Sequence, residues 1–588
     1  MRLEGYLVIG TRTQQLGLFD VGNVYSLDLG ESSFYHQLAV AGPRLFRDED
    51  FAEFYATVPS RPSVPPSQLA LMTLLHQYTG CSDQEAVERS AYDLRWCAVL
   101  GKAAGEPLCA KSTFQLFRAH LVVHEKMGAI LVKSIEEAKR SGLLKRGSAL
   151  KVHLDTKPII GRGSVEDTYN LLGRGIRGLV EALARLVRCE PREWAAAHDL
   201  GRYFTSSLKG SAGIDWSEAG ERQALLTEIV VDARRVLRLA GQALAAVGAE
   251  ERGRTRVREA AQLLTRVLLQ DIEQVEDGEG GIQASLKEGT APERMPSLTD
   301  PEQRHGRKSK SKRFTGHKAA VVVDAESQII TDVAVLPGNA SDAEGALGQV
   351  ERSEENTGER VAESTGDCAY GNPETRDAFA AAGRDFAAKV PQESGNGGRY
   401  PKSMFRLDLE GNTVTCPAGH TIGRFEHEKG GGKVFRFGAL CQGCPLRDAC
   451  TTAAEGRTIH VHRQEAGRAQ ARAYQKTPEG KARLCSRVVV EHALARLAGL
   501  GIGQARYLGR AKTLFQLTMA ATVANLRRVW NWEANGAQGG CEGAPGHSRQ
   551  GRDAGAATIL RAVWGRLRLH IVRWMRPAEA GLAQSFGF

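Results

Sequence analysis

The sequence lacks any run of apolar residues that approaches the roughly 18 needed for a transmembrane helix. The apolar stretch inside its opening, MRLEGYLVIG, is too short for a signal peptide. No internal repeat is visible along the 588 residues. These absences predict a cytosolic chain of several compact units that has no membrane partner.

An even set of regularly spaced cysteines is also missing, because the eleven cysteines form an odd total. Such a number fits a disulfide framework poorly, and cytosolic thiols are kept reduced. We therefore expect the cysteines to be free thiols or metal ligands.

Charged residues are common, and positive charges outnumber negative ones. Lys and Arg number 78 against 68 Asp and Glu, which gives a formal net charge of +10. This excess suits a polyanionic partner. Charge alone would suit nucleic acid or an anionic membrane surface, and the lack of a long apolar run weakens the membrane interpretation.

The first part of the chain predicts short helices. PSVPPSQLALMTLLHQYTG indicates a helix that starts at Ser67 and stops near Gly80, and Ser82 and Glu85 have the spacing of a capping box. Ser112 is expected to cap one longer helix through FQLFRAHLVVHEKMGAILVKSIEEAKRSG. Basic residues on these helices fit a helix-turn-helix unit, while an ordinary helical bundle with solvated charges fits equally well.

The pattern then changes from helical to alternating. ALKVHLDTKPII predicts a strand that ends at Asp155, and residues 168 to 290 return to a helical pattern. HKAAVVVDAESQIITDVAVLPGN predicts two strands joined as a hairpin, followed by a helix from about Ser341 and a short strand in RDFAAKV. Strands alternating with helices predict an α/β core.

Three carboxylates stand on separate predicted elements: Asp155 on the strand, Asp367 in STGDCAYGN, and Glu491 as the one acid of SRVVVEHALARLAGLGIGQARYLGRAKT. Taken singly, each has an ordinary explanation, since an Asp at a strand end is usually a turn or cap residue and Glu491 can pair with Arg487 one turn earlier. Taken together, oxygen-only ligands suit Mg²⁺, and phosphoryl transfer uses two such ions roughly 3.5 to 4 Å apart.

The chain as a whole resembles the DDE-type bacterial insertion-sequence transposases. The resemblance lies in HLDTKPI, DPEQRHGRKSKSKRFTGHKAAVVVD, LPGNASD, GDCAYGN and the block from SRVVVEHALARLAGLGIG to ANLRRV, with further similarity in SRPSVPPSQLALMTLL and AYDLRWCAVLG. These segments occur in order over most of residues 45 to 530.

The resemblance implies an α/β fold: an RNase H-like mixed sheet flanked by helices, interrupted by a helical insertion and a cysteine-containing insertion, behind an N-terminal all-helical domain. The implied layout is 1–145 for the helical DNA-binding domain, 146–167 with 300–394 for the catalytic core, 168–299 for the helical insertion, 395–465 for the cysteine insertion, 466–532 for the helices that carry Glu491, and 533–588 for a flexible linker and basic tail.

The implied activity is that of a DNA transposase that binds the terminal inverted repeats of its element. Asp155, Asp367 and Glu491 would coordinate two Mg²⁺ ions, which Mn²⁺ can replace, for phosphodiester hydrolysis and strand transfer. The implied partners are double-stranded end and target DNA and further copies of the chain, in a dimer or larger assembly at the nucleoid. Two alternatives stay open: an endonuclease of the same fold that cuts without joining, and a decayed or domesticated DNA-binding protein.

The chain departs from the pattern of some related transposases at two positions near the third acid. Leu484 stands where they have Tyr, three residues before Arg487, and Ala498 stands where they have Lys, seven residues after Glu491. These departures affect the expected grip on the DNA ends more than the expected chemistry.

Basic residues in two segments are the predicted phosphate contacts, which add salt-sensitive affinity without base specificity. As solvated surface charge, or as part of a disordered loop, the same residues would have no specific role. The predicted DNA-binding residues are Arg487, Arg506, Arg510 and Lys512 in the C-terminal block and Arg307, Lys308, Lys310, Lys312 and Arg313 in RHGRKSKSKR.

A Gly-rich segment carries four cysteines, Cys416 in TCPAGH and Cys441, Cys444 and Cys450 in LCQGCPLRDAC. A CxxC pair is the usual knuckle of a thiolate zinc site, and the other two thiols can complete a tetrahedron, with His420 or His460 as substitutes for one of them. A structural Zn²⁺ that orders this segment and a reduced loop without metal both stay open.

Overall fold

The computed structural model of the chain describes residues 9–12, 29–55, 62–245, 251–276, 282–309, 311–390, 397–428 and 430–538. Contacts divide the chain into two compact units, Met1–Ala534 and Asn535–Phe588. The predicted basic tail beyond residue 538 lies outside the described residues, as does Lys310.

The N-terminal region is helical, and local sequence signals set most of its helix ends. The predicted stop near Gly80 is confirmed, since Gly80 follows its helix in the left-handed conformation with φ 66°. The predicted capping box is also confirmed, because the Ser82 side chain accepts from the Glu85 N–H while the Glu85 carboxylate accepts from the Ser82 N–H. The elements are α2 (Phe34–Leu45), the 3₁₀ helix η1 (Asp48–Phe54), α3 (Pro66–Thr79), α4 (Asp83–Tyr92), α5 (Leu94–Leu100), α6 (Lys111–Val123) and α7 (Met127–Arg140).

The prediction of one long helix capped by Ser112 is wrong. The structure has two helices, α6 and α7, and the residue before α6 is Ala110. Between the helices Glu125 adopts a left-handed conformation with φ 54°. That conformation breaks the i to i−4 hydrogen-bond ladder, so the chain changes direction there.

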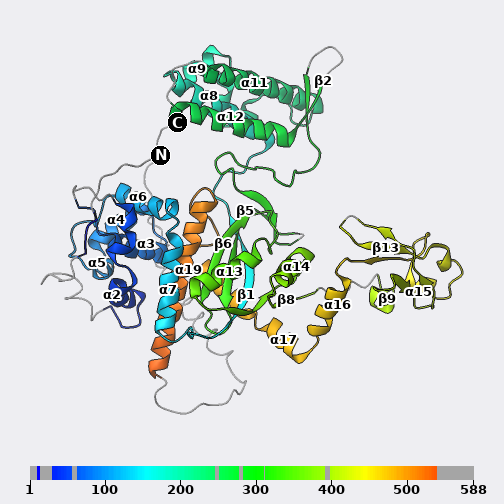
Figure 1. The fold of residues 1–588 in the computed structure, drawn as a ribbon. Coiled ribbons are helices and arrows are strands. Elements are labelled where there is room, and N and C mark those ends of the chain that lie inside the picture. Colours follow the sequence, from blue (N-terminus) through cyan, green and yellow to red (C-terminus); the bar gives the residue numbers. More distant parts are fainter. Residues whose placement is uncertain are drawn as a thin grey trace, which may run out of the picture. The chain divides into compact units, whose positions relative to one another are not determined.

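A mixed sheet forms the centre of the α/β region (Figure 1). Strand β1 (Leu150–Ile160) pairs antiparallel with β5 (Arg313–Asp324) on one side and parallel with β7 (Val361–Gly366) on the other. Strand β6 (Ile330–Pro337) and β4 (Arg304–Arg307) pair antiparallel with β5, and β8 (Phe386–Ala388) pairs parallel with β7. The predicted β5–β6 hairpin, the predicted β8 strand and the α/β class are thereby confirmed.

Two strand and helix boundaries differ from the predictions. β1 continues five residues past Asp155, because its pairing with β5 runs on to Ile160 opposite Gly316. The helix expected from Ser341 begins later, as α13 (Ala346–Thr357), after a turn that contains Gly345 at φ 69°. Asp155 therefore lies inside a strand, where its side chain is held more firmly than at a strand end.

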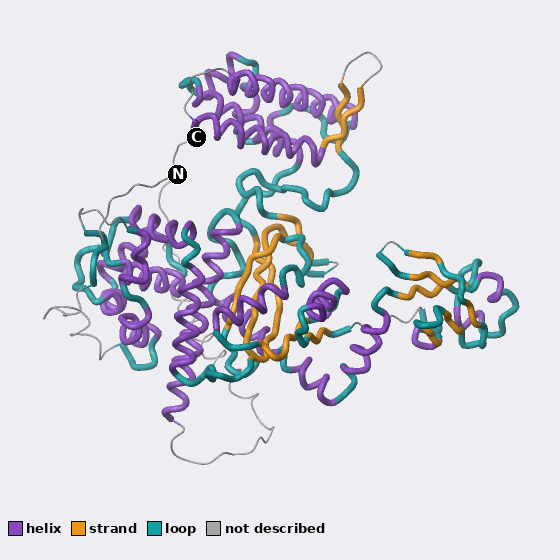
Figure 2. Tube along the Cα trace, in the orientation of Figure 1, coloured by secondary structure: helices purple, strands orange, loops and turns teal. Residues whose placement is uncertain are grey.

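Residues 168–286 form a helical segment with its own apolar core (Figure 2). The prediction of an all-helical insertion is right for the helices and wrong at their end, where two antiparallel strands follow. The elements are α8 (Thr168–Leu186), α9 (Pro191–Ala197), η2 (Gly201–Phe204), α10 (Leu208–Ser211), α11 (Ala219–Ala245), α12 (Glu251–Asp271), β2 (Ile272–Glu276) and β3 (Ile282–Leu286).

The cysteine-bearing segment consists of short strands and turns (Figure 2). Its elements are η4 (Lys402–Met404), β9 (Arg406–Asp408), β10 (Thr413–Thr415), β11 (Thr421–Ile422), β12 (Glu426–His427), β13 (Lys433–Arg436), η5 (Gly438–Cys441), α15 (Arg447–Cys450) and β14 (Thr458–Val461). They form two three-stranded sheets, β11-β10-β9 and β12-β13-β14.

Helices return at the C-terminal side of this segment. α16 (Glu465–Tyr474) and α17 (Pro478–Cys485) lead to α18 (Val488–Gly499), which packs on β1 and β5, and α19 (Arg510–Gln538) follows. After β7, η3 (Cys368–Tyr370) and α14 (Pro373–Ala381) complete the described elements. No helix among the described residues has the length and apolar character required to traverse a bilayer.

Candidate active site

Asp155 lies on the central strand of the sheet, opposite Val321 of β5. Its carboxylate accepts the Thr156 N–H at 2.7 Å and pairs with the Arg487 guanidinium at 3.2 Å. Burial raises the pKa of Asp155 to about 6, although the Arg487 charge and the Thr156 N–H act to lower it. The negative charges of Asp367 and Asp342 raise the pKa further, which places both carboxylates in the neighbourhood of Asp155.

Asp367 directly follows β7, the parallel neighbour of β1. His153 of β1 stands opposite Thr365 of β7, so continuing both strands by two residues brings Asp155 and Asp367 side by side. Asp367 also caps η3, because its side chain accepts the Ala369 N–H at 2.8 Å. The register of two neighbouring strands thus unites two of the three predicted acids.

The start of α18 is fixed against β1 by two contacts. Arg487, the residue before the helix, holds Asp155, and the Ser486 hydroxyl lies 3.1 Å from His153 Nε2. The helix buries Val490, Leu494 and Leu497 against the sheet, as its periodicity predicts.

Glu491 is exposed on α18, one turn after Arg487. Among the described residues, Glu491 makes no hydrogen bond or ion pair. Arg487 pairs with Asp155 instead of Glu491, so the intrahelical pair considered from the sequence does not form. The structure therefore docks the helix of the third acid on the strand of the first, with the Glu491 carboxylate unengaged.

Two residues at this site had no predicted role. Asp342 follows β6 and pairs with Lys318 at 2.7 Å. Tyr370, from η3, is fully buried, and its hydroxyl has no hydrogen-bond partner. Burial raises the pKa of Tyr370 well above its ordinary value, and the negative charges of Asp155, Asp342 and Asp367 raise it further. The motif LPGNASD contains Asp342, and its one acid was the available sequence signal.

The predicted phosphate contacts of the C-terminal block have different environments. The Arg506 guanidinium is turned toward the N-terminal helices, where it contacts His76 Nε2 at 3.3 Å and the Cys81 carbonyl. Arg510 pairs with Glu302 at 3.2 Å, and both side chains are about half exposed. Lys512 is exposed.

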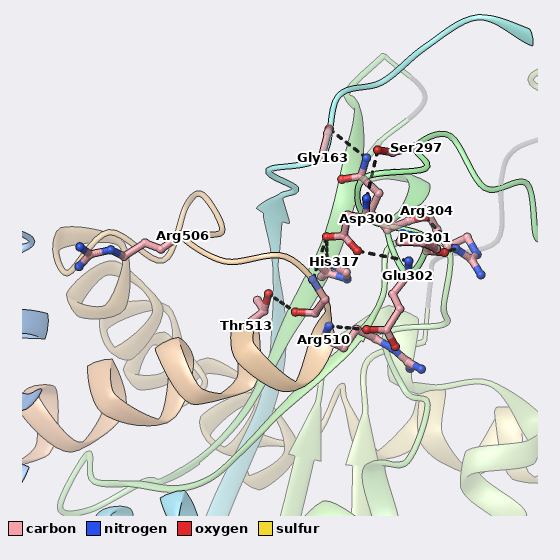
Figure 3. Close-up of polar contacts among 12 residues, drawn as sticks. Gly163, Ser297, Asp300, Pro301, Glu302, Arg304, His317, Arg506, Arg510 and Thr513 are labelled. Atoms are coloured by element: carbon pink, nitrogen blue, oxygen red, sulfur yellow. Dashed lines mark hydrogen bonds and ion pairs between the residues drawn. The ribbon is translucent and has the colours of Figure 1, made fainter. Parts of the chain in front are cut away.

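Figure 3 shows how the start of α19 is held near β5. The buried Asp300 carboxylate accepts the Gly509 N–H at 3.1 Å and lies 3.4 Å from His317 Nε2. Glu302 accepts the Arg510 N–H at 2.8 Å, and the Thr513 hydroxyl donates to the Gly509 carbonyl at 2.8 Å. This network anchors the segment 300–303 and the start of α19 to one strand, leaving the Arg510 head near solvent.

The basic run after residue 304 is a β-hairpin, not a disordered loop. Arg307 of β4 stands opposite Arg313 of β5, and the Lys308 N–H donates to the Lys312 carbonyl at 2.8 Å. Arg307, Lys308, Lys312 and Arg313 are all exposed, and none forms an ion pair with another residue in the described part of the chain. The hairpin tip is therefore a free basic surface.

The four predicted zinc ligands lie around one cavity of the cysteine-bearing segment. Cys416, Cys441, Cys444 and Cys450 line a single small cavity, together with His420. His460 is exposed and lies 3.5 Å from Glu428, outside the residues that line this cavity. Among the described residues, no group of three or more His, Cys, Asp or Glu side chains is positioned as it stands to hold a metal ion, either at this cavity or at the carboxylates.

Comparison with protein families gives two matches. Residues 415–530 match the family described as "Transposase DDE domain", and residues 29–120 match "Transposase domain (DUF772)". The first match contains Arg487 and Glu491, whereas Asp155 and Asp367 lie outside both. A search of curated proteins found no match.

Proposed function

We propose that this chain, which the two family matches indicate to be a DDE-type insertion-sequence transposase, cleaves DNA at the ends of its element and joins those ends to target DNA. Asp155, Asp367 and Glu491 are the proposed catalytic acids. The proposal rests mainly on one observation: the helix that carries Glu491, inside the matched region, begins with an arginine that holds Asp155, the strand neighbour of Asp367.

The donor set fits a hard divalent cation. Asp155 and Asp367 offer oxygen ligands only, which is the chemistry that Mg²⁺ and Mn²⁺ prefer. The Asp155 carboxyl is mostly buried beside two further carboxylates, and its pKa of about 6 shows that the surroundings do not fully compensate its charge. Asp155 and Asp367, with Glu491 from α18, are the residues that would hold the metal.

The chemistry that Mg²⁺ supplies when bound is stabilisation of the attacking and leaving oxygens of a phosphodiester. The chain's own residues supply the geometry. The β1–β7 register sets the separation of Asp155 and Asp367, and the Ala369 N–H orients the Asp367 carboxylate. The Arg487 guanidinium offsets the Asp155 charge and is placed to meet a phosphate at the same spot.

DNA contacts are proposed at exposed cations that are not committed to internal ion pairs. The hairpin tip, with Arg307, Lys308, Lys312 and Arg313, fits this description best. Lys512 is a further candidate, and Arg510 would have to share its guanidinium with Glu302. Arg506 is a weaker candidate for a DNA contact, because its guanidinium already contacts the N-terminal helices. Loss of one phosphate contact is expected to reduce the salt dependence of binding by about one unit of slope.

The sheet supports the proposed RNase H-like core. Its antiparallel half, β6-β5-β1, continues into a parallel half, β1-β7-β8, and α13 and α18 pack on the strands. The N-terminal helices, which include the second family match, are the proposed binding unit for the terminal inverted repeats. Pairing of two ends would require at least two copies of the chain, acting on DNA in the cytoplasm.

Cleavage and joining of DNA that carries the element's ends, with Mg²⁺ or Mn²⁺, tests the proposal. Asp367→Asn keeps a residue that caps η3 equally well but removes the charge, so DNA binding should persist while both reactions fall by roughly 10³-fold. The matched control is Asp167→Asn, since Asp167 caps α8 by the same kind of contact. Cleavage without joining by the unmodified chain would favour an endonuclease, and binding without either reaction would favour a decayed DNA-binding protein.

A further inference from the structure

Four cysteines from separate short elements line one cavity of the cysteine-bearing lobe, which we define as residues 397–461. Cys416 follows β10, Cys441 ends η5, Cys444 lies in the next turn, and Cys450 ends α15. The cavity they line measures about 20 Å³.

The backbone around these thiols is arranged in tight turns. The Cys416 N–H donates to the His420 carbonyl at 2.9 Å, and the Gly419 N–H donates to the Cys416 carbonyl at 2.9 Å. Between Cys441 and Cys444, Gly443 has φ 77°, a conformation that glycine adopts without strain. Each turn therefore presents its thiol on a closed loop of main chain, as the knuckles of thiolate metal sites do.

One main-chain group already points at a sulfur. The Arg457 N–H donates to Cys441 Sγ at 3.3 Å. Donors of this kind orient a metal-binding thiolate and reduce its negative charge. Arg447 and Arg457 also line the cavity, so two cations stand next to the site at which thiolates would accumulate.

The lobe has little else to stabilise it. The buried residues of its apolar cluster are Phe405, Val414, Phe435, Phe437, Ile459 and Val461, together with the Cys450 thiol, and Val434 is buried as well. Its strands are two to four residues long. Segments of this size rarely stabilise themselves through apolar burial alone and usually depend on disulfides or a metal.

We propose that Cys416, Cys441, Cys444 and Cys450 bind one structural Zn²⁺ ion. Four thiolates form a closed tetrahedral site with Zn–S distances of about 2.3 Å, so the sulfurs draw together around the ion. Each thiol releases its proton to solvent on binding, and the resulting charge of −2 is offset by Arg447 and Arg457. With no ligand position left for water, the ion orders the lobe and takes no part in the DNA chemistry. The inference does not depend on the proposed function.

Metal analysis of the full-length protein, purified without chelator or added metal, tests the proposal. We expect about one zinc per chain in the unmodified protein and its loss in Cys441→Ser and Cys444→Ser, whose sites are only half buried. Cys189→Ser is the matched control, because Cys189 is also half buried but belongs to the helical segment. It should keep its zinc.

Replacement of the metal by Co²⁺ gives a second measurement, the absorption spectrum of the bound metal. In the unmodified protein it does not depend on how well a variant folds. A tetrahedral four-sulfur site gives intense thiolate-to-cobalt charge-transfer and d–d bands, whereas a site with His420 in place of one thiol shifts the d–d bands. His420→Ala should leave the cobalt spectrum unchanged, and a change would overturn the four-thiol assignment. Unmodified protein with all four thiols reactive and no zinc would overturn the proposal, as would protein with these cysteines joined in disulfides.

Discussion

The sheet core and the cysteine-bearing lobe differ in what stabilises their structure. In the core, β5 has nine consecutive buried residues from Gly316 to Asp324, and the sheet belongs to an apolar cluster that extends into α18 and α19. In the lobe, the strands are two to four residues long and the apolar cluster has only seven buried members, one of them a cysteine. Apolar burial can fix the first region, while the second has a small apolar cluster and is the region for which we propose a structural metal.

This difference determines which of the two regions can bury charged groups. A well-packed sheet keeps its geometry around groups that are costly to bury, such as Asp155 and Asp332, whose pKa values burial raises to about 6. The lobe has no such margin, and its polar cluster is made of thiols that a metal can neutralise. The sheet core is thus suited to holding charged groups in a fixed geometry for chemistry. The lobe is suited to being ordered by a metal bound to its thiols.

The largest expected effect is loss of core packing beneath the third acid. Leu497 is fully buried on α18, so Leu497→Ala should lower the free energy of unfolding by about 2–5 kcal/mol. Val488 lies on the same helix with 47% of its surface exposed, so Val488→Ala should cost about 0.5 kcal/mol or less. Urea unfolding followed by tryptophan fluorescence measures both, and equal losses would contradict the packing of α18 on the sheet.

The second prediction concerns pH. Burial raises the pKa of Asp332 from 3.8 to about 6, although Arg352 acts to lower it. Between these values the folded state holds a proton that the unfolded state has released, so the free energy of unfolding falls as pH rises through this interval. Asp332→Asn cannot ionise and should lack this fall, which amounts to about 1–3 kcal/mol.

Urea unfolding of both proteins from pH 4 to pH 7 checks this prediction. Arg352→Gln removes the cation that favours the charged form of Asp332, so its stability should fall more steeply over the same interval. Parallel pH profiles for all three proteins would show that Asp332 ionises as freely in the folded chain as in the unfolded one.

The third prediction separates the two regions directly, and it depends on the proposed zinc. Chelation should speed amide hydrogen exchange in residues 397–461 by about tenfold or more, equivalent to about 1.4 kcal/mol, and leave β1 and β5 unchanged. Hydrogen exchange with mass spectrometry resolves both regions in one experiment. Unchanged exchange in the lobe would mean that its own packing suffices.

The smallest effect is expected at an exposed ion pair within the lobe. Arg436 and Glu426 pair at 3.3 Å with side chains 58% and 65% exposed. Arg436→Ala should therefore change the free energy of local opening, measured by hydrogen exchange, by less than about 0.5 kcal/mol. A larger effect would show that surface charge, rather than the thiol cluster, stabilises β12 and β13.

Features that depend on a few neighbouring residues were predictable from the sequence. The end of α3 follows from Gly80 and the start of α4 from the Ser82–Glu85 capping box, because those signals act within one helical turn. The β5–β6 hairpin follows from its apolar runs and the polar turn between them. The division into α6 and α7 was missed, because Glu125 is not a residue type that marks a left-handed break.

Features of the candidate site that depend on distant contacts were not predictable. Spacing alone made Glu491 the obvious partner of Arg487, but the fold brings Asp155 to Arg487 across more than 300 residues. The proximity of Asp342 and the buried Tyr370 to the acids likewise depends on the sheet register. The convergence of four cysteines was suggested by the CxxC pair, although the contribution of Cys416 depends on how the turns fold.

We propose that the exposed, unpaired Glu491 completes the site formed by Asp155 and Asp367. The most direct test is Mg²⁺-dependent joining of element-end DNA by Glu491→Gln, compared with Glu479→Gln, an exposed glutamate on the preceding helix. We expect Glu491→Gln to bind DNA normally but to lose joining by roughly 10³-fold, and Glu479→Gln to keep it. Equal joining by the two variants would contradict the account.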